Sequence, residues 1–182
     1  MNVCVYCAAS DRVDPAYSEI ATSLGRLLGE RKNTLVYGGG NTGPILALAK
    51  AVKDTGGRVV AVVPKALEGA GVTFDGSDEI VTTEDYQKRH LTMLKESDVF
   101  VALPGGYGTV AEIAENLSMR QLALHQKPLS LINKDGFWNG FLSFLDHLEA
   151  GEFILPEHRK LVHVAPSPEI ALEYLDQYAP AG

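Results

Sequence analysis

The stretch DVFVALPGGYGTVAE, residues 98–112, runs from an apolar segment through a glycine-rich turn into a segment with helical periodicity. Glycines let the backbone turn sharply after a strand, and the following helix presents unpaired N–H groups and the positive end of its dipole. This order predicts an anion site that suits a phosphate. We expect Glu112 in the first helical turn, where the dipole favours a carboxylate but a phosphate at the same point would repel it. A ligand with a phosphate at one end and a reacting centre nearby satisfies both groups.

The same order of strand and helix continues along the whole chain. Strand-like runs occupy 2–7, 34–37, 58–63, 79–82, 100–103, 128–132 and 161–164, and helix-like segments occupy 17–31, 45–53, 85–95, 110–125, 137–148 and 168–178. Continuous apolar strands are typical of a parallel sheet that is buried on both faces by helices and joined by right-handed crossovers. We predict one α/β domain over residues 1–182, doubly wound and Rossmann-like, with a frayed tail at 179–182.

Composition limits the class of partner. The formal net charge of -7 opposes binding to nucleic acid or to an anionic membrane surface, so the phosphate should belong to a small molecule. The N-terminal run MNVCVYC is much shorter than a membrane span and has no basic leader, which favours the cytoplasm over secretion or a membrane.

Cys4 and Cys7 form a C-x-x-C pattern, which in other settings holds a metal or a disulfide. Residues three apart in an extended strand point to opposite faces, so we expect two separate buried thiols. The five histidines are scattered along the chain rather than spaced as zinc ligands. We therefore predict no metal and no cofactor.

A second glycine-rich turn, YGGGNTG at 37–43, follows the second predicted strand. Glycine after a strand most often makes only a turn, but parallel strands end at one edge of their sheet. Both turns should therefore line one crevice, with Gly39 and Gly40 near the ligand. Neither turn is a dinucleotide fingerprint, because the next strand runs into Pro64 and Lys65 instead of an acidic residue. A nicotinamide-dependent oxidoreductase is disfavoured for this reason.

Arg89 lies in EDYQKRHLTM, residues 84–93, within a short basic run. Such a run is usually a solvated helix face, and the pattern alone favours that interpretation.

Together these segments resemble the LONELY GUY (LOG) family, the cytokinin riboside 5′-monophosphate phosphoribohydrolases, which are often mislabelled as lysine decarboxylases. The resemblance covers nearly the whole chain. Its most specific element is PGGYGTVAE, which matches the family pattern P-G-G-x-G-T-x-x-E. Further support comes from VYCAAS, LVYGGG, VVAVVP, Arg89 with Met93, HQKPLSLIN and GFWNGFLSFLDHL.

The resemblance implies a homodimeric enzyme that hydrolyses the N-glycosidic bond of a nucleoside 5′-monophosphate. The substrate would be a cytokinin riboside monophosphate or AMP, and the products a free base and ribose 5-phosphate. Arg89 and Glu112 are the implied catalytic pair. The residues expected at the phosphate or elsewhere on the substrate are Ser10, Gly39, Gly40, Glu79, His90, Gly105, Gly106, Tyr107, Gly108, Thr109 and Glu115.

The implied roles agree with the chemistry of the bond. Cleavage between C1′ and the base develops positive charge on the ribose, so a carboxylate such as Glu112 can stabilise that charge or activate water. The departing base gains electron density and needs a donor. Arg89 can supply positive charge, but a guanidinium is a poor literal acid.

Structural alternatives stay open for these residues. Glu112 could serve solely to complement the helix dipole, and Thr109 could serve solely to cap the helix. Glu115 is as readily structural as functional. The alternative function is a carrier of a nucleotide or phosphorylated cofactor on the same scaffold, which would need neither Arg89 nor Glu112.

The chain departs from the family pattern around the expected ligand. His90 stands where the family has lysine, and Ala8 and Ala9 stand where glycine and serine are usual. Pro-Ile-Leu, ending at Leu46, replaces Leu-Met-Gly, and Met119 replaces a tryptophan. The base therefore stays open between a prenylated adenine, adenine and another nucleobase.

Overall fold

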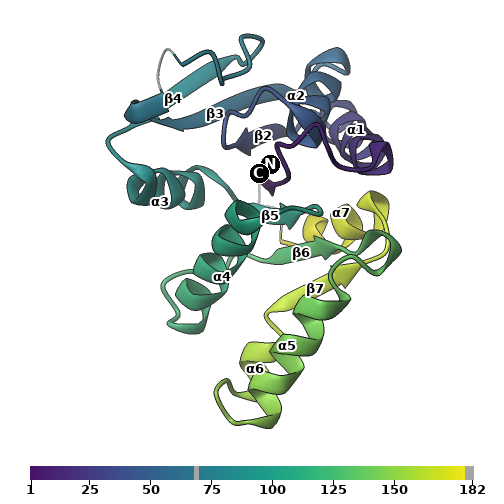
Figure 1. The fold of residues 1–182 in the computed structure, drawn as a ribbon, viewed down its shortest axis with the longest axis vertical. Coiled ribbons are helices and arrows are strands. Elements are labelled where there is room, and N and C mark those ends of the chain that lie inside the picture. The colour runs from purple at the N-terminus through teal and green to yellow at the C-terminus, as the bar shows by residue number, and fades with distance from the viewer. Residues whose placement is uncertain (68–69, 179–182) are drawn as a thin grey trace.

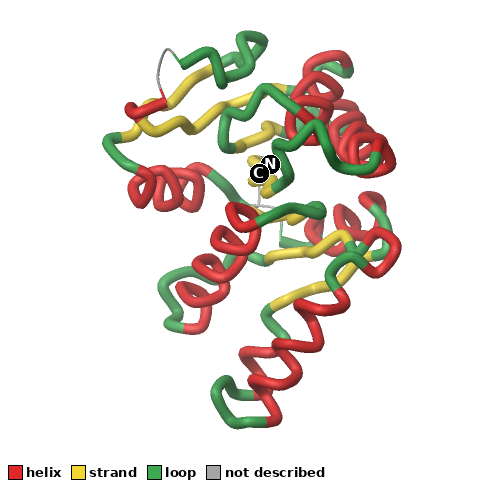
Figure 2. Tube along the Cα trace, in the orientation of Figure 1, coloured by secondary structure: helices red, strands yellow, loops and turns green. Residues whose placement is uncertain are grey.

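Seven strands form one parallel sheet in a computed structural model that describes residues 1–67 and 70–178 (Figures 1 and 2). The strands are β1 (Asn2–Tyr6), β2 (Thr34–Tyr37), β3 (Arg58–Pro64), β4 (Glu79–Thr83), β5 (Val99–Ala102), β6 (Leu129–Ile132) and β7 (Val162–Ala165). The helices are α1 (Pro15–Glu30), α2 (Gly43–Asp54), α3 (Tyr86–Glu96), α4 (Tyr107–Gln121), α5 (Asn139–Ala150), α6 (Pro156–Arg159) and α7 (Pro168–Asp176). The tail predicted at 179–182 lies outside the described residues.

The order of the strands places the crevice. It runs β4-β3-β2-β1-β5-β6-β7, and every neighbouring pair is parallel, with Val3 of β1 opposite Leu35 of β2 and Val99 of β5. The chain winds outward from β1 in both directions, which confirms the predicted doubly wound fold. In such sheets the ligand crevice lies beyond the carboxyl ends of the strands where the order reverses, here between β1 and β5.

Helices cover both faces of the sheet, and β1 shows how the core is divided (Figure 1). Its Val3 and Val5 pack toward α1, α2 and α7, whereas Cys4 and Tyr6 pack toward α3, α4 and α5. Cys7 packs against the first of these layers. The prediction of two separate thiols is confirmed, because both cysteines are free and lie on opposite faces.

Three details differ from the expectations. The edge strand β4 is not buried on both faces, since Ile80 is 51% exposed. The short helix α6 was not predicted, because four residues are too few to show a helical period. Helix α4 spans Tyr107–Gln121 rather than the predicted 110–125, so Glu112 lies in its second turn and not in its first.

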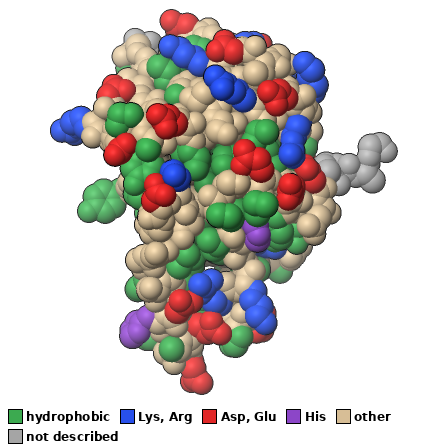
Figure 3. Space-filling view, turned by 90° about the vertical axis from the view of Figure 1, so that its right-hand side faces the viewer, with side chains coloured by type: hydrophobic (Ala, Val, Ile, Leu, Met, Phe, Trp, Pro, Cys, Tyr) green, Lys and Arg blue, Asp and Glu red, His purple; other side chains and the backbone are tan. Residues whose placement is uncertain are grey.

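Two structural findings bear on partners. Within residues 1–67 and 70–178, no helix combines the length and apolar character needed to cross a bilayer, and no three His, Cys, Asp or Glu side chains are placed to hold a metal. On the face drawn in Figure 3, lysine and arginine side chains alternate with aspartate and glutamate instead of forming one basic patch.

Candidate active site

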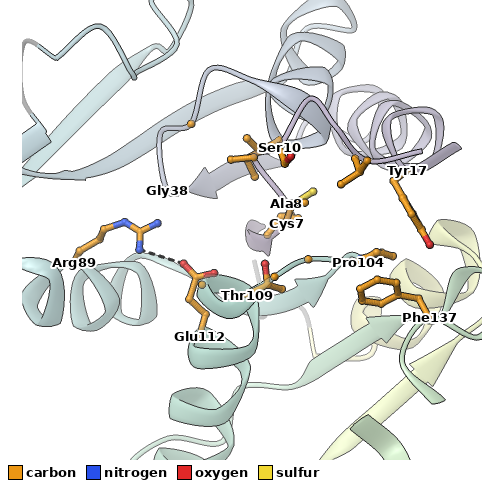
Figure 4. A pocket seen from close by; sticks show the side chains of 18 of the residues that line it. Cys7, Ala8, Ser10, Tyr17, Gly38, Arg89, Pro104, Thr109, Glu112 and Phe137 are labelled. Atoms are coloured by element: carbon orange, nitrogen blue, oxygen red, sulfur yellow. Dashed lines mark hydrogen bonds and ion pairs between the residues drawn. The ribbon is translucent and has the colours of Figure 1, made fainter. Parts of the chain in front are cut away.

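A cavity of about 630 Å³ lies where the strand order reverses, within the volume range of small-molecule sites (Figure 4). Its walls come from the loop after β1, the glycine turn after β2, Arg89 of α3 and the glycine turn after β5. The rings of Tyr17 and Phe137, which meet edge to face at 5.7 Å, line its apolar end. Both glycine-rich turns therefore share one cavity, as predicted.

The turn after β5 is open to a ligand. Gly106 is the N-cap of α4 and no side chain caps the helix. The N–H groups of Tyr107, Gly108 and Thr109 form no hydrogen bond with any described residue. Thr109 is the third residue of α4, so the interpretation of Thr109 as an N-cap is wrong. Three free donors at a helix N-terminus make a site for a phosphate.

The turn after β2 leads into a helix whose first N–H donors are occupied by the protein itself, and we call it the closed turn. The N–H of Gly43 donates to Oδ1 of Asp11 at 2.6 Å, and the N–H of Ile45 donates to the carbonyl of Ala8 at 3.0 Å. Pro44, between them, has no N–H. The first three residues of α2 therefore have no free N–H group for an anion.

One face of α4 is buried and polar. Thr109, Glu112 and Asn116 are 3%, 8% and 3% exposed, and their spacing of three and four residues places them in one row. A helix normally buries apolar side chains, and a buried carboxylate needs a partner. This row therefore marks the functional side of α4.

Arg89 is the partner of Glu112. Its Nη1 donates to Oε1 of Glu112 at 3.2 Å, and its Nε donates to the carbonyl of Val62 at 3.1 Å (Figure 4). The guanidinium lies 5.0 Å from the ring centre of Tyr86. A β-carbon on Gly38 would collide with Nη2, so the glycine at this position makes room for the arginine. The solvated-face interpretation is wrong for Arg89, which is only 7% exposed.

The charge state of Glu112 reflects opposed effects. Burial raises the pKa of its carboxyl, and the neighbouring side chains of Arg89 and His90 counteract part of that rise. The second-turn position of Glu112 also removes the interpretation that it serves the helix dipole, whose effect is confined to the first turn.

The structure separates the predicted residues into two groups. Those that line the cavity are Ser10, Gly40, Arg89, Gly105, Gly106, Gly108, Thr109 and Glu112. Those that do not are Gly39, Glu79, His90, Tyr107 and Glu115.

Each residue outside the cavity wall has a visible reason. Glu79 lies at the amino end of the edge strand β4, whereas the cavity lies beyond the carboxyl ends of the strands, and it pairs with Arg58. The side chain of Tyr107 is 97% exposed. His90 and Glu115 are bonded to each other on the far side of Glu112. A contact from Glu79 to the ligand is thus not supported by this geometry.

The residues of the wall that sequence reasoning missed include Gly38, Tyr17, Tyr86 and Phe137. Gly38 was within reach as part of the glycine turn, but its role depends on Arg89 from a different element. Tyr17 and Phe137 are joined only by the fold, because 120 residues separate them in the chain. No local spacing could have connected them.

Comparison with known proteins agrees with the geometry. Residues 45–175 match the protein family described as possible lysine decarboxylase. The chain is 40% identical over 179 residues to a probable cytokinin riboside 5′-monophosphate phosphoribohydrolase of Oryza sativa subsp. japonica, covering 98% of this chain and 79% of that one. It is 38% identical over 179 residues to a cytokinin riboside 5′-monophosphate phosphoribohydrolase of Arabidopsis thaliana, covering 98% and 82%. The Moco carrier protein from Chlamydomonas reinhardtii has a similar structure, with a TM-score of 0.71, 26% identity and coverage of 97% and 96%.

Proposed function

This chain belongs to the LONELY GUY (LOG) family of cytokinin riboside 5′-monophosphate phosphoribohydrolases, and on that premise we propose that it hydrolyses the N-glycosidic bond of a nucleoside 5′-monophosphate. The products are a free base and ribose 5-phosphate. One observation carries the proposal: the open amide turn of α4 and the buried Arg89–Glu112 pair line the same cavity. A phosphate and a reacting sugar can therefore be held together.

We assign the 5′-phosphate to the N–H groups of Tyr107, Gly108 and Thr109. These donors are free, and hydrogen bonds from them to an anion are charge-assisted. The contact fixes one end of the nucleotide, so that the entropy of positioning the ribose is lost on binding and not in the chemical step. The phosphate thus serves mainly to position the substrate.

Glu112 is assigned to the ribose. In its ionised form it stabilises the positive charge that develops at C1′, or takes a proton from the attacking water. The water oxygen bonds to C1′ while the bond from C1′ to the base breaks, and the base leaves with that electron pair and gains a proton. Because burial raises the pKa of Glu112, the rate should rise with pH as this carboxyl ionises.

Arg89 is assigned to the charge of the transition state. Its Nη1 and Nε are used within the protein, whereas no described residue accepts a hydrogen bond from its Nη2. That group can donate to the departing base or to the sugar. The contacts to Val62 and Tyr86 hold the guanidinium in place, as a preorganised charge requires.

Decarboxylation of lysine, which the name of the matching family suggests, does not fit the wall of this cavity. Amino-acid decarboxylation through a pyridoxal cofactor uses a lysine that forms a Schiff base. No lysine is among the described residues that line the cavity. The relatives named as phosphoribohydrolases support cleavage of a glycosidic bond instead.

The alternative function is that of a carrier, which the likeness to the Moco carrier protein favours. A carrier needs the open turn but has no use for a buried Arg–Glu pair beside it. Turnover therefore separates the two functions.

Three further points belong to the proposal. We propose a homodimer, from the resemblance, and a cytoplasmic location. The names of the relatives support a cytokinin riboside monophosphate as the substrate, and we propose AMP as the other candidate. Catalysis is proposed to need neither metal nor cofactor.

The decisive experiment incubates the protein with AMP, with isopentenyladenosine 5′-monophosphate and with adenosine. Free base and ribose 5-phosphate, or ribose from adenosine, are measured by chromatography. We expect base release from at least one monophosphate and far slower release from adenosine, which lacks the positioning phosphate. Tight binding of the monophosphates without base release would favour the carrier.

A further inference from the structure

His90 lies directly behind the proposed catalytic carboxylate. Its side chain is 13% exposed and does not line the main cavity. Its Nδ1 is hydrogen-bonded to Oε2 of Glu115, and its Nε2 lies 3.9 Å from Oε1 of Glu112. The imidazole therefore stands between two carboxylates of α4, of which Glu112 borders the cavity and Glu115 is 38% exposed.

The number of N–H groups on the imidazole decides whether this arrangement is favourable. A neutral imidazole has one N–H donor and one acceptor nitrogen, whereas an imidazolium has two donors. Ionised carboxylates only accept. A neutral His90 would donate to one carboxylate and turn a lone pair toward the other, so only the imidazolium suits both.

No other described group beside His90 is free to supply the positive charge of an imidazolium. On its own helix it is flanked by Arg89, which is already bonded to Glu112, and by the ring of Tyr86, which meets the imidazole at 5.2 Å and a steep angle. From β1, Tyr6 borders the same small space. Burial raises the pKa of Tyr6 well above its ordinary value, so this hydroxyl stays neutral.

The space between His90 and Glu112 allows the contact. A cavity of about 10 Å³ lies there, bordered also by Asn116, and this is close to the volume that one water needs. Nε2 of His90 and both amide atoms of Asn116 are buried without a hydrogen bond among the described residues. A separation of 3.9 Å can be bridged by one water or closed by a small shift of the side chains.

We propose that His90 is a positioning residue whose imidazolium form holds the Glu112 carboxylate in place for the reaction. The inference rests on the proposed function, because it takes Glu112 as the catalytic carboxylate. Turnover then requires an ionised Glu112 and a doubly protonated His90 at the same time. This predicts a bell-shaped dependence of kcat on pH, with the alkaline limb set by His90.

The kinetic test measures kcat for AMP against pH in the wild type, His90→Gln and His90→Lys. Glutamine carries no charge, so the alkaline limb should disappear and the maximal kcat should fall about tenfold or more. Its acid limb should move to higher pH, because one of the charges that counteract the raised pKa of Glu112 is gone. Lysine stays charged well above neutrality, so its alkaline limb should move upward and its kcat should exceed that of glutamine.

Two controls separate positioning from general damage. The same change at the exposed His147 should leave the whole profile as in the wild type. The KM for AMP should change by less than about threefold in His90→Gln, because the amide turn that binds the phosphate is untouched. If His90→Gln keeps the alkaline limb of the wild type, the inference is wrong.

A second measurement needs no turnover. Nitrogen NMR of the wild-type protein, with His90 assigned from the His90→Gln spectrum, shows whether both ring nitrogens carry a proton at neutral pH. Two protonated nitrogens are expected, and a single one would overturn the inference. If the wild type releases no base from any monophosphate, the proposed function fails, while the NMR result still decides the state of His90.

Discussion

The two glycine-rich turns of this protein look alike in sequence and differ in what they offer a ligand. Both follow strands that flank β1, both lead into a helix, and both line the same cavity. The first turn of α4 has three free N–H groups, whereas in the first turn of α2 the N–H groups of Gly43 and Ile45 donate to Asp11 and to the carbonyl of Ala8. The number of glycines therefore does not decide anion binding. What decides it is whether another loop already occupies the donors.

The closed turn has a different task. Gly38 leaves the space that Arg89 fills, and Arg89 in turn bonds to Glu112. In the proposed function, one turn holds the ligand and the other shapes the pair that acts on it. Substitutions in the open turn should accordingly change KM, whereas substitution of Gly38 in the closed turn should change kcat.

Removing the charge of Glu112 should have the largest effect on kcat, because the open turn alone binds the phosphate and supplies no group for the chemical step. Glu112→Gln should lower kcat for AMP about a thousandfold while the protein still binds AMP. Calorimetry measures the binding and base release measures the rate. Glu79→Gln is the matched control, since Glu79 lies at the amino end of β4 and does not line the cavity. This variant should be as active as the wild type. Equal losses in both variants would refute the assignment of catalysis to Glu112.

Gly38→Ala should have the next largest effect, although Gly38 is in the closed turn. The added methyl collides with the guanidinium of Arg89, and displacement of a catalytic group by about 1 Å can cost about a hundredfold in rate. We expect that loss in kcat with a smaller change in KM.

A double-mutant cycle shows whether the glycine acts through the arginine. Gly38→Ala should cost little more once Arg89→Ala is present, because the colliding group is gone. Additive losses would mean that Gly38 acts on the ligand directly, and the division of tasks between the turns would fail.

Much of this fold could be predicted from the sequence, because each strand is a short apolar run that local periodicity reveals. The predicted runs overlap all seven strands of the sheet. The errors lie where distant contacts decide. The exposed edge at β4 depends on strand order, which no single segment contains, whereas the position of Glu79 away from the cavity already follows from its place at the start of a parallel strand.

The site shows the same limit. The motif at 104–112 identified the anion turn and Glu112, since both lie within nine residues. The closure of the other turn depends on Asp11, about thirty residues earlier in the chain, and remained invisible to local pattern. Arg89 was found through family resemblance, because its own segment looked like a solvated helix face.

Tyr107→Pro tests the open turn with a smaller expected effect. Tyr107 is the first residue of α4, where proline is tolerated, and Gly106 before it is extended as proline requires. The substitution removes one free N–H and should raise the KM for AMP about tenfold, with kcat nearly unchanged. Tyr107→Ala keeps the N–H and removes only an exposed ring, so it should match the wild type. A Tyr107→Pro protein with normal KM would show that this amide does not hold the phosphate.

Asp11→Ala should have the smallest effect on catalysis, because it changes only the start of α2 and leaves Gly38 and the open turn unaltered. It removes the acceptor of the Gly43 N–H and should lower the free energy of unfolding by about 1 kcal/mol, as loss of a helix cap does. The KM for AMP should stay within about twofold of the wild type, since the carbonyl of Ala8 still occupies Ile45. Denaturant unfolding measures the first quantity and steady-state kinetics the second. A KM raised as far as in Tyr107→Pro would mean that the closed turn also binds the nucleotide, and the contrast between the two turns would be lost.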